Sequence, residues 1–237
     1  MVTRIINFAF GEFYHVYNRG NGKQIIYKDA ADYRRFTELL FLSNSHKSIN
    51  VRDIKKQMSA FDFDRGEPLV KIGAYCLMPN HFHILLTPYA ENGVSVFMNK
   101  LGTSYSMYFN RRYNRTGSLF EGSFKAEFVD NDEYLKYLFS YIHLNPIKLI
   151  QSDWKQVGIN DAKKAFEYLK NYKYSSFAEY DVDDVNIEMV NNDKSGLVRK
   201  EREILNKEVF PNYFISPKDF GRELLGWMEF EPKLQKP

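Results

Sequence analysis

Hydrophobic residues alternate with polar residues, or recur at helical spacing, over most of the first three quarters of the chain. This pattern predicts strands at 10–19, 70–77, 82–87 and 118–129, and helices at 30–43, 95–110 and 130–144. A Pro-Asn pair at 79–80 favours a tight hairpin turn between the second and third strands. The last helix is predicted to begin at Asp130, with Glu133 completing a capping box, and to end before Pro146.

The order of these elements is β-α-β-β-α-β, followed by a further helix. It predicts an α+β fold: a ferredoxin-like βαββαβ antiparallel sheet with helices on one face. Residues 179–193 hold six acidic side chains and neither Lys nor Arg. We therefore expect a main domain at 1–178, an acidic linker at 179–193 and a small helical extension at 194–237. Helical spacing at 197–205 and 217–228 predicts that the extension packs on the main domain or on a partner.

The composition excludes several classes of protein. Of the 237 residues, 44% are hydrophobic and 27% are charged, which is enough apolar material for a core and argues against a disordered chain. No apolar run reaches the roughly 18 residues of a membrane span, and the first residues do not form a secretory signal. The single cysteine, Cys76, allows neither an internal disulfide nor a Cys-rich zinc site. We expect a cytoplasmic protein with no membrane partner.

Charge gives a weaker indication of the partner. The net charge of +3 is too small to indicate a polyanion by itself. Basic residues do cluster locally at Arg111, Arg112 and Arg115. Three aromatic residues at 108–113 lie next to this cluster in the sequence. This mixture is typical of a groove for single-stranded nucleic acid, but also of a solvated helix end.

Candidate chemistry begins at the His81-Phe82-His83 tripeptide in a predicted strand. Alternate residues of a strand point to the same face, so both imidazoles should project together and Phe82 into the opposite layer. Two imidazoles on one face can bind a divalent ion, although such a pair at a strand end often binds nothing, and a third ligand is needed. His15, on the first strand, is expected either near this pair or as a hydrogen-bonded, partly buried histidine.

The last predicted helix can supply a third ligand and a nucleophile. Tyr141 and Asn145 are four residues apart and therefore share one helix face. The Asn145 amide oxygen suits Mg²⁺ or Mn²⁺, and a tyrosine near the ion could attack a metal-polarised phosphodiester. Tyr134 is expected too far from Asn145 to serve the same ion, and Tyr137, two turns away, is awkwardly placed for it. Two alternatives stay open: Tyr141 also fits a hydrophobic core stripe, and Asn before Pro often closes a helix.

Four segments of the chain resemble the IS200-like transposases, a family of HUH single-strand DNA transposases, and above all their REP-associated tyrosine transposase branch. They are YHVYNRGN at 14–21, AYCLMPNHFHIL at 74–85, GSLFEGSFK at 117–125 and YIHLNPIK at 141–148, with a weaker match, YSSF, at 174–177. The segments occur in the family's order over about Phe13 to Tyr180. Their order makes the resemblance far more specific than a lone His-Phe-His.

The resemblance implies a site and a reaction. His81 and His83 match the HUH pair that binds the metal, Mg²⁺ or Mn²⁺. Tyr141 matches the nucleophile, which forms a 5′-phosphotyrosine link, and Asn145 matches the third metal ligand. The substrate would be single-stranded DNA with a hairpin, which the protein would cleave and rejoin as a metal-dependent transesterase.

Candidate DNA contacts are Arg19, Arg111, Arg112, Arg115 and Lys125. The protein would be a monomer or a homodimer, nucleoid-associated when it is bound to DNA. Two rival functions remain. One is a non-catalytic protein that binds single-stranded nucleic acid on the same fold. The other is a metal-dependent phosphoesterase without a tyrosine nucleophile.

Overall fold

The computed structural model describes residues 7–49, 54, 58–180, 199–211 and 226. Within these residues, four strands form one antiparallel sheet in the order β2-β3-β1-β4. The strands are β1 (Phe13–Arg19), β2 (Val70–Met78), β3 (His81–Pro88) and β4 (Lys125–Val129). With the helices between them, they give the predicted ferredoxin-like βαββαβ arrangement of an α+β protein.

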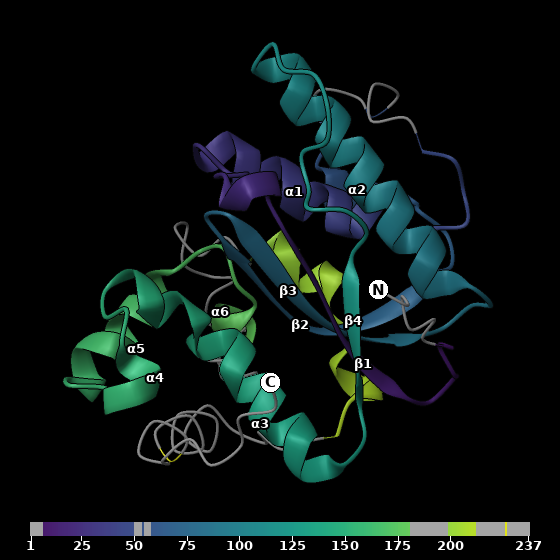
Figure 1. The fold of residues 1–237 in the computed structure, drawn as a ribbon. Helices are drawn as coiled ribbons and strands as arrows, with labels where there is room; N and C mark the ends of the chain where they lie inside the picture. The colour runs from purple at the N-terminus through teal and green to yellow at the C-terminus, as the bar shows by residue number, and fades with distance from the viewer. Residues whose placement is uncertain (1–6, 50–53, 55–57, 181–198, 212–225, 227–237) are drawn as a thin grey trace, which may run out of the picture.

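Three helices cover the two faces of this sheet (Figure 1). The two helices inside the repeat, α1 (Ala30–Leu42) and α2 (Gly93–Arg112), lie on one face, as predicted. The third, α3 (Asp132–Leu144), crosses the opposite face and adds a second layer. Because both faces are covered, β2 and β3 are buried along nearly their whole length.

The shorter helices and helical turns follow mainly in the second half of the chain. They are α4 (Trp154–Val157), α5 (Ala162–Asn171) and α6 (Phe177–Tyr180), with 3-10 turns η1 (Asn21–Lys23), η3 (Ala60–Asp62), η4 (Asn145–Leu149), η6 (Lys200–Ile204) and η7 (Lys207–Val209). None of the helices in the described ranges is long and apolar enough to cross a membrane.

Two predicted boundaries were wrong. The residue that caps α3 is Asn131, whose side-chain oxygen accepts the backbone N–H of Tyr134 at 2.7 Å, so the capping box from Asp130 to Glu133 does not form. The strand predicted at 118–129 is only the five residues of β4, because the chain before it turns through Gly122, whose φ is 71°.

A buried hydrogen-bond network joins α3 to β2. The Nε2 atom of His143 lies 2.8 Å from Ser176 Oγ, and its Nδ1 atom lies 3.0 Å from the carbonyl oxygen of Phe139. The same serine hydroxyl accepts the backbone N–H of Tyr75 at 2.9 Å, and the Ser176 N–H donates to the Tyr75 carbonyl oxygen at 3.0 Å. These bonds fix α3 against the strand that lies at one edge of the sheet.

The described part of the C-terminal extension packs on the main domain. Leu205 forms a parallel bridge with Ile72 of β2. The Phe210 ring packs directly on Gly73, because a Cβ atom added to this glycine would lie only 2.6 Å from the ring. Glu179, at the start of the predicted linker, belongs to α6 and pairs with Arg199 at 3.4 Å. Residues 181–193 of the predicted linker lie outside the described residues, as does the helix predicted at 217–228 apart from position 226.

Candidate active site

His81 and His83 project from β3 toward α3, as the strand alternation predicts. Their ring centroids are 5.0 Å apart. Phe82, between them, packs in the opposite layer with its ring centroid 5.0 Å from that of Phe36 in α1. His83 is buried and lies opposite Tyr17 of β1, whereas His81 is half-buried near the hairpin. The two imidazoles therefore share one face of the sheet.

Hydrogen bonds leave one nitrogen of each imidazole available. His81 Nδ1 lies 2.6 Å from Asn80 Oδ1, which only accepts, so Nδ1 carries the proton and Nε2 keeps its lone pair. His83 Nδ1 lies 2.8 Å from His15 Nε2, and His83 Nε2 is buried without a partner among the described residues. Burial, aided by the charge of Lys148, lowers the pKa of His81 to about 4. Burial also holds the pKa of His83 well below its usual value. Both histidines are neutral at pH 7, which is the form that binds metals.

Tyr141, which belongs to α3, faces the histidines on this side of the sheet. Its ring centroid is 5.5 Å from that of His83, at an interplanar angle of 74°, and 6.4 Å from that of His15. Tyr137 stacks against it with centroids 6.0 Å apart. Burial raises the pKa of Tyr141, and the side chain of Asn145 acts in the opposite direction. The tyrosine and the histidines thus meet within one chain.

Asn145 closes α3 and is fully buried, with its amide next to the Tyr141 hydroxyl, yet neither Oδ1 nor Nδ2 makes a hydrogen bond of normal geometry in the part of the chain that the structure describes. Leaving such a group unsatisfied costs about 1–3 kcal/mol. A buried amide oxygen and two neutral imidazole nitrogens are a donor set that fits Mn²⁺ or Mg²⁺. No cluster of three His, Cys, Asp or Glu side chains suited to a metal occurs in the described ranges.

His15 fits both of its predicted descriptions, because it lies beside His83 and is also a buried, hydrogen-bonded histidine. It is buried, and its Nδ1 atom lies 3.7 Å from Glu127 Oε2. Glu127 also accepts hydrogen bonds from the hydroxyls of Tyr17, at 2.7 Å, and Tyr134, at 3.2 Å. The interaction with His15 lowers the pKa of Glu127 to about 2, so this carboxylate is ionised. Tyr134 therefore reaches the edge of the site through Glu127, closer than the helical spacing suggested.

The sequence analysis did not identify two lysines that lie next to the site. Lys155 of α4 places its Nζ atom 3.8 Å from the centroid of the Tyr141 ring. Burial lowers its pKa to about 8, and burial also lowers the pKa of Lys148. Lys148 follows Asn145 by three residues and could have been identified from helical spacing. No signal in the sequence connects Lys155 with Tyr141.

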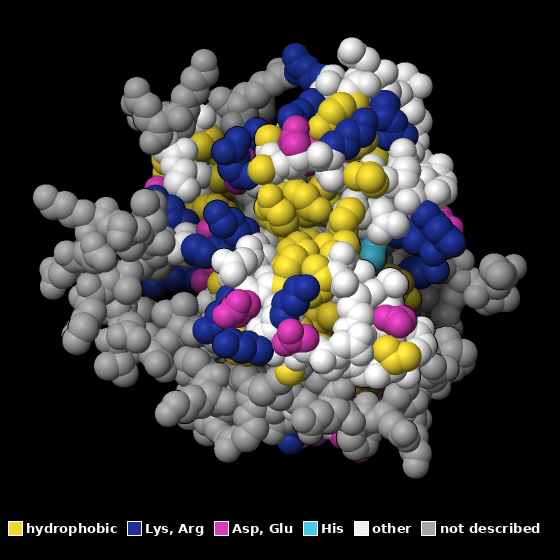
Figure 2. Space-filling view, turned by 90° about the vertical axis from the view of Figure 1, so that its left-hand side faces the viewer, with side chains coloured by type: hydrophobic (Ala, Val, Ile, Leu, Met, Phe, Trp, Pro, Cys, Tyr) yellow, Lys and Arg dark blue, Asp and Glu magenta, His cyan; other side chains and the backbone are white. Residues whose placement is uncertain are grey.

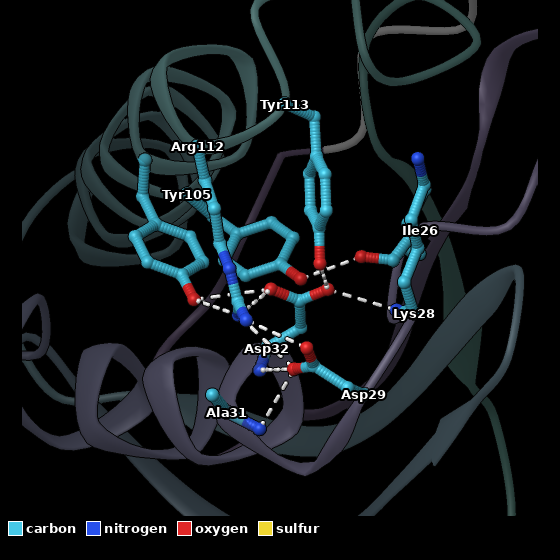
Figure 3. Close-up of polar contacts among 9 residues, drawn as sticks. Ile26, Lys28, Asp29, Ala31, Asp32, Tyr105, Arg112 and Tyr113 are labelled. Atoms are coloured by element: carbon cyan, nitrogen blue, oxygen red, sulfur yellow. Dashed lines mark hydrogen bonds and ion pairs between the residues drawn. The ribbon is translucent and has the colours of Figure 1, made fainter.

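The five candidate DNA contacts differ in their partners within the described chain. Arg112 bonds to Asp29 at 2.6 Å and to Asp32 at 2.7 Å, and Figure 3 shows the buried Asp32 carboxylate at the centre of this network. Tyr108 and Tyr113 also donate to Asp32, at 3.0 and 2.8 Å. Arg112 therefore joins the end of α2 to the start of α1.

The other four cations lie at the surface. Arg19 pairs with Glu121. The Nη1 atom of Arg115 lies 3.4 Å from Asn110 Oδ1. Arg111 and Lys125 are exposed. Contact of these four residues with DNA remains a prediction.

The fold and the site define an α+β protein with a ferredoxin-like sheet, on one face of which two histidines, a tyrosine and an asparagine converge. Residues 40–145 match the family model described as "Transposase IS200 like". The matched residues include His81, His83, Tyr141 and Asn145.

Other comparisons add one structure. The chain is similar to a solved structure described as a REP-associated tyrosine transposase bound to a REP hairpin, with 13% identity and a TM-score of 0.47. The similarity covers 76% of this chain and 84% of that one. No curated protein sequence matches the chain.

Proposed function

We propose that this protein is a metal-dependent DNA transesterase that cleaves and rejoins single-stranded hairpin DNA through a 5′-phosphotyrosine link to Tyr141. One observation carries the proposal. The Tyr141 ring lies against His83, whose buried Nε2 atom has no partner among the described residues, and the same holds for the side chain of Asn145. A metal ion and a phosphate would satisfy these groups.

His81, His83 and Asn145 would hold the ion, Mg²⁺ or Mn²⁺. When bound, the ion withdraws charge from the scissile phosphate and fixes its orientation. The protein supplies neutral imidazoles, because burial keeps both histidines unprotonated at pH 7. Asn145 offers an uncharged oxygen, so the protein ligands leave the full positive charge of the ion for the phosphate.

Tyr141 would act as the nucleophile. Its phenolic oxygen forms a bond to phosphorus, and the 3′ oxygen leaves and takes up a proton. The same 3′-hydroxyl, or another one, attacks the phosphotyrosine in the joining step, so no external energy source is needed. The Lys155 ammonium lies near the ring and would stabilise the negative charge of a phenolate there.

A single chain supplies all of these groups, so we propose that Tyr141 acts in cis and that a monomer is competent. The match of residues 40–145 to the IS200-like transposase model supports DNA as the substrate. The surface of the protein also supports single-stranded DNA as the ligand. Figure 2 shows hydrophobic side chains gathered on one face, bordered by Lys and Arg, with a histidine at the edge. Such a surface can stack bases and neutralise phosphates.

The test is covalent capture. The protein is incubated with Mn²⁺ and a panel of single-stranded hairpins, and adducts are resolved on a denaturing gel. Tyr141→Phe should bind Mn²⁺ and DNA but form no adduct. Tyr137→Phe is the matched control, because it removes a hydroxyl from the ring stacked on Tyr141, and it should retain adduct formation.

The rival functions give different results in the same assay. Nicking without an adduct would indicate a phosphoesterase that uses water. Hairpin binding without any cleavage would indicate a non-catalytic binding protein.

A further inference from the structure

We propose that Glu127 and His15 form a positioning relay that holds His83 in the tautomer with its lone pair on Nε2. The inference rests on the proposed function in one respect, which is that His83 is a metal ligand. His15 and Glu127 would not touch the metal or the DNA. They would act only through His83.

The sheet brings the three residues together from three strands. β1 lies between β3 and β4, and His15 pairs with Glu127 of β4 across the antiparallel register. On its other side His15 reaches His83 of β3 diagonally, with Nε2 and Nδ1 2.8 Å apart and the rings nearly parallel at 22°. His15 and His83 are buried, whereas Glu127 is about half exposed.

Proton positions follow from the chemistry at the two ends. A neutral imidazole carries one N–H, and a carboxylate can only accept. The Glu127 carboxylate faces His15 Nδ1 at 3.7 Å, which favours the proton on that nitrogen. His15 Nε2 must then accept, so His83 Nδ1 donates to it and His83 Nε2 keeps its lone pair. A metal-binding histidine commonly depends on such a partner at its second nitrogen.

The carboxylate is itself held in place. The hydroxyls of Tyr17, from β1, and Tyr134, from α3, both donate to Glu127. Each of its oxygens therefore has a fixed donor, and the oxygen bonded to Tyr134 is the one that faces His15. The relay starts from an oriented charge rather than from a mobile side chain.

A second buried histidine shows what a purely structural role looks like in this protein. His143 uses both nitrogens, one with the Phe139 carbonyl oxygen and one with Ser176 Oγ. His83 is equally enclosed but uses only Nδ1, and its Nε2 atom has no partner in the described ranges. The two buried histidines thus differ at Nε2: in His143 this nitrogen is hydrogen-bonded within the protein, whereas in His83 it is left for a metal.

The experiment compares His15→Phe with His15→Gln. Phenylalanine cannot accept a hydrogen bond from His83, whereas the glutamine side-chain oxygen can. Long-range ¹H–¹⁵N NMR of the metal-free protein reports the tautomer of His83, and calorimetry reports its Mn²⁺ affinity. We expect the Nδ1–H tautomer in the wild type, its loss in His15→Phe with about 10- to 100-fold weaker Mn²⁺ binding, and recovery of most of both in His15→Gln.

The relay is overturned if wild-type His83 carries its proton on Nε2, or if His15→Phe binds Mn²⁺ as tightly as the wild type. Should His15→Phe not fold, Glu127→Ala replaces it, since this carboxylate is about half exposed and its loss should also weaken the tautomer preference. Wild-type protein that binds no Mn²⁺ would refute the proposed function instead, and the NMR result would still decide the relay.

Discussion

The Lys155 ammonium lies 3.8 Å from the centre of the Tyr141 ring, so a partly dehydrated cation sits beside the proposed nucleophile. Burial, with a contribution from Lys148, lowers the pKa of Lys155 to about 8, below the usual value near 10.4. The folded protein therefore has to keep a charge in an environment that disfavours it. Such a charge costs stability and is retained where function needs it.

Replacing Lys155 should separate stability from function. Between pH 8 and about 10.4 the unfolded chain binds more protons at this residue than the folded one, so this lysine makes stability rise with pH in that window. Lys155→Met should unfold at a higher temperature than the wild type at pH 7, with a smaller difference at pH 9.5, and should form less covalent adduct. Thermal unfolding at the two pH values checks this. A variant that is less stable at pH 7 would show that the ammonium is stabilising.

Asn145→Leu should stabilise the metal-free protein by about 1–2 kcal/mol, because it removes a buried amide without a partner in the described chain. The same variant should lose the rise in melting temperature that Mn²⁺ gives the wild type. Asn44→Leu is the matched control. Asn44 is equally buried, but its side chain bonds to the backbone of Leu69 and Val70 at 2.8–2.9 Å, so its loss should destabilise. Equal destabilisation by both changes would mean that Asn145 is satisfied within the protein.

Arg112→Ala should lower the free energy of unfolding, because it leaves the buried Asp32 carboxylate without its cation. Arg111→Ala, one residue away and exposed, should change stability by less than about 0.5 kcal/mol. If Arg111 contacts a DNA phosphate, its loss should flatten the salt dependence of single-strand binding by about 0.7 in slope. Urea denaturation and binding titrations at several salt concentrations measure the two effects. An Arg112→Ala variant as stable as the wild type would contradict the structural role.

Acid should weaken the fold through buried neutral histidines. Burial lowers the pKa of His143 to about 3, so below about pH 6.5 the unfolded chain takes up a proton that the folded chain does not. Stability should therefore fall as the pH drops from 6.5 to 4.5. His143→Gln should reduce this slope by up to about 1.4 kcal/mol per pH unit. Denaturation midpoints at several pH values test it, and an unchanged slope would mean that His143 is not the titrating group.

Local periodicity predicted correctly which of the candidate residues share a face. The two-residue period of a strand put His81 and His83 on one face and Phe82 on the other, whatever lay around them. The helical period likewise put Tyr141 and Asn145 on one face of α3. These relationships depend only on the backbone geometry of a single element, so the sequence suffices to predict them.

Relationships between distant elements could not be predicted in this way. Glu127 meets His15 only because β4 pairs with β1, and Lys155 meets Tyr141 only through the packing of α4. The basic cluster near the end of α2 indicated a DNA groove, but Asp29 and Asp32, about 80 residues earlier in the chain, bind Arg112. Partners that are distant in the sequence therefore decide whether a charged side chain remains available to bind DNA.

The bond between His143 and Ser176 has a consequence for the chemistry. Tyr141 and Asn145 belong to the helix that Ser176 connects to β2 through its bonds to His143 and Tyr75. Ser176 therefore helps to fix the distance of Tyr141 and Asn145 from the histidines, although it is not itself part of the site. Slippage of this helix by a single residue would move both groups by about 1.5 Å. Misplacement on that scale can slow a reaction by about 100-fold while the protein stays folded. Loss of the Ser176 hydroxyl would therefore destabilise the protein, by leaving the buried His143 Nε2 atom and the Tyr75 N–H without this partner, and would also release the helix that carries Tyr141 and Asn145.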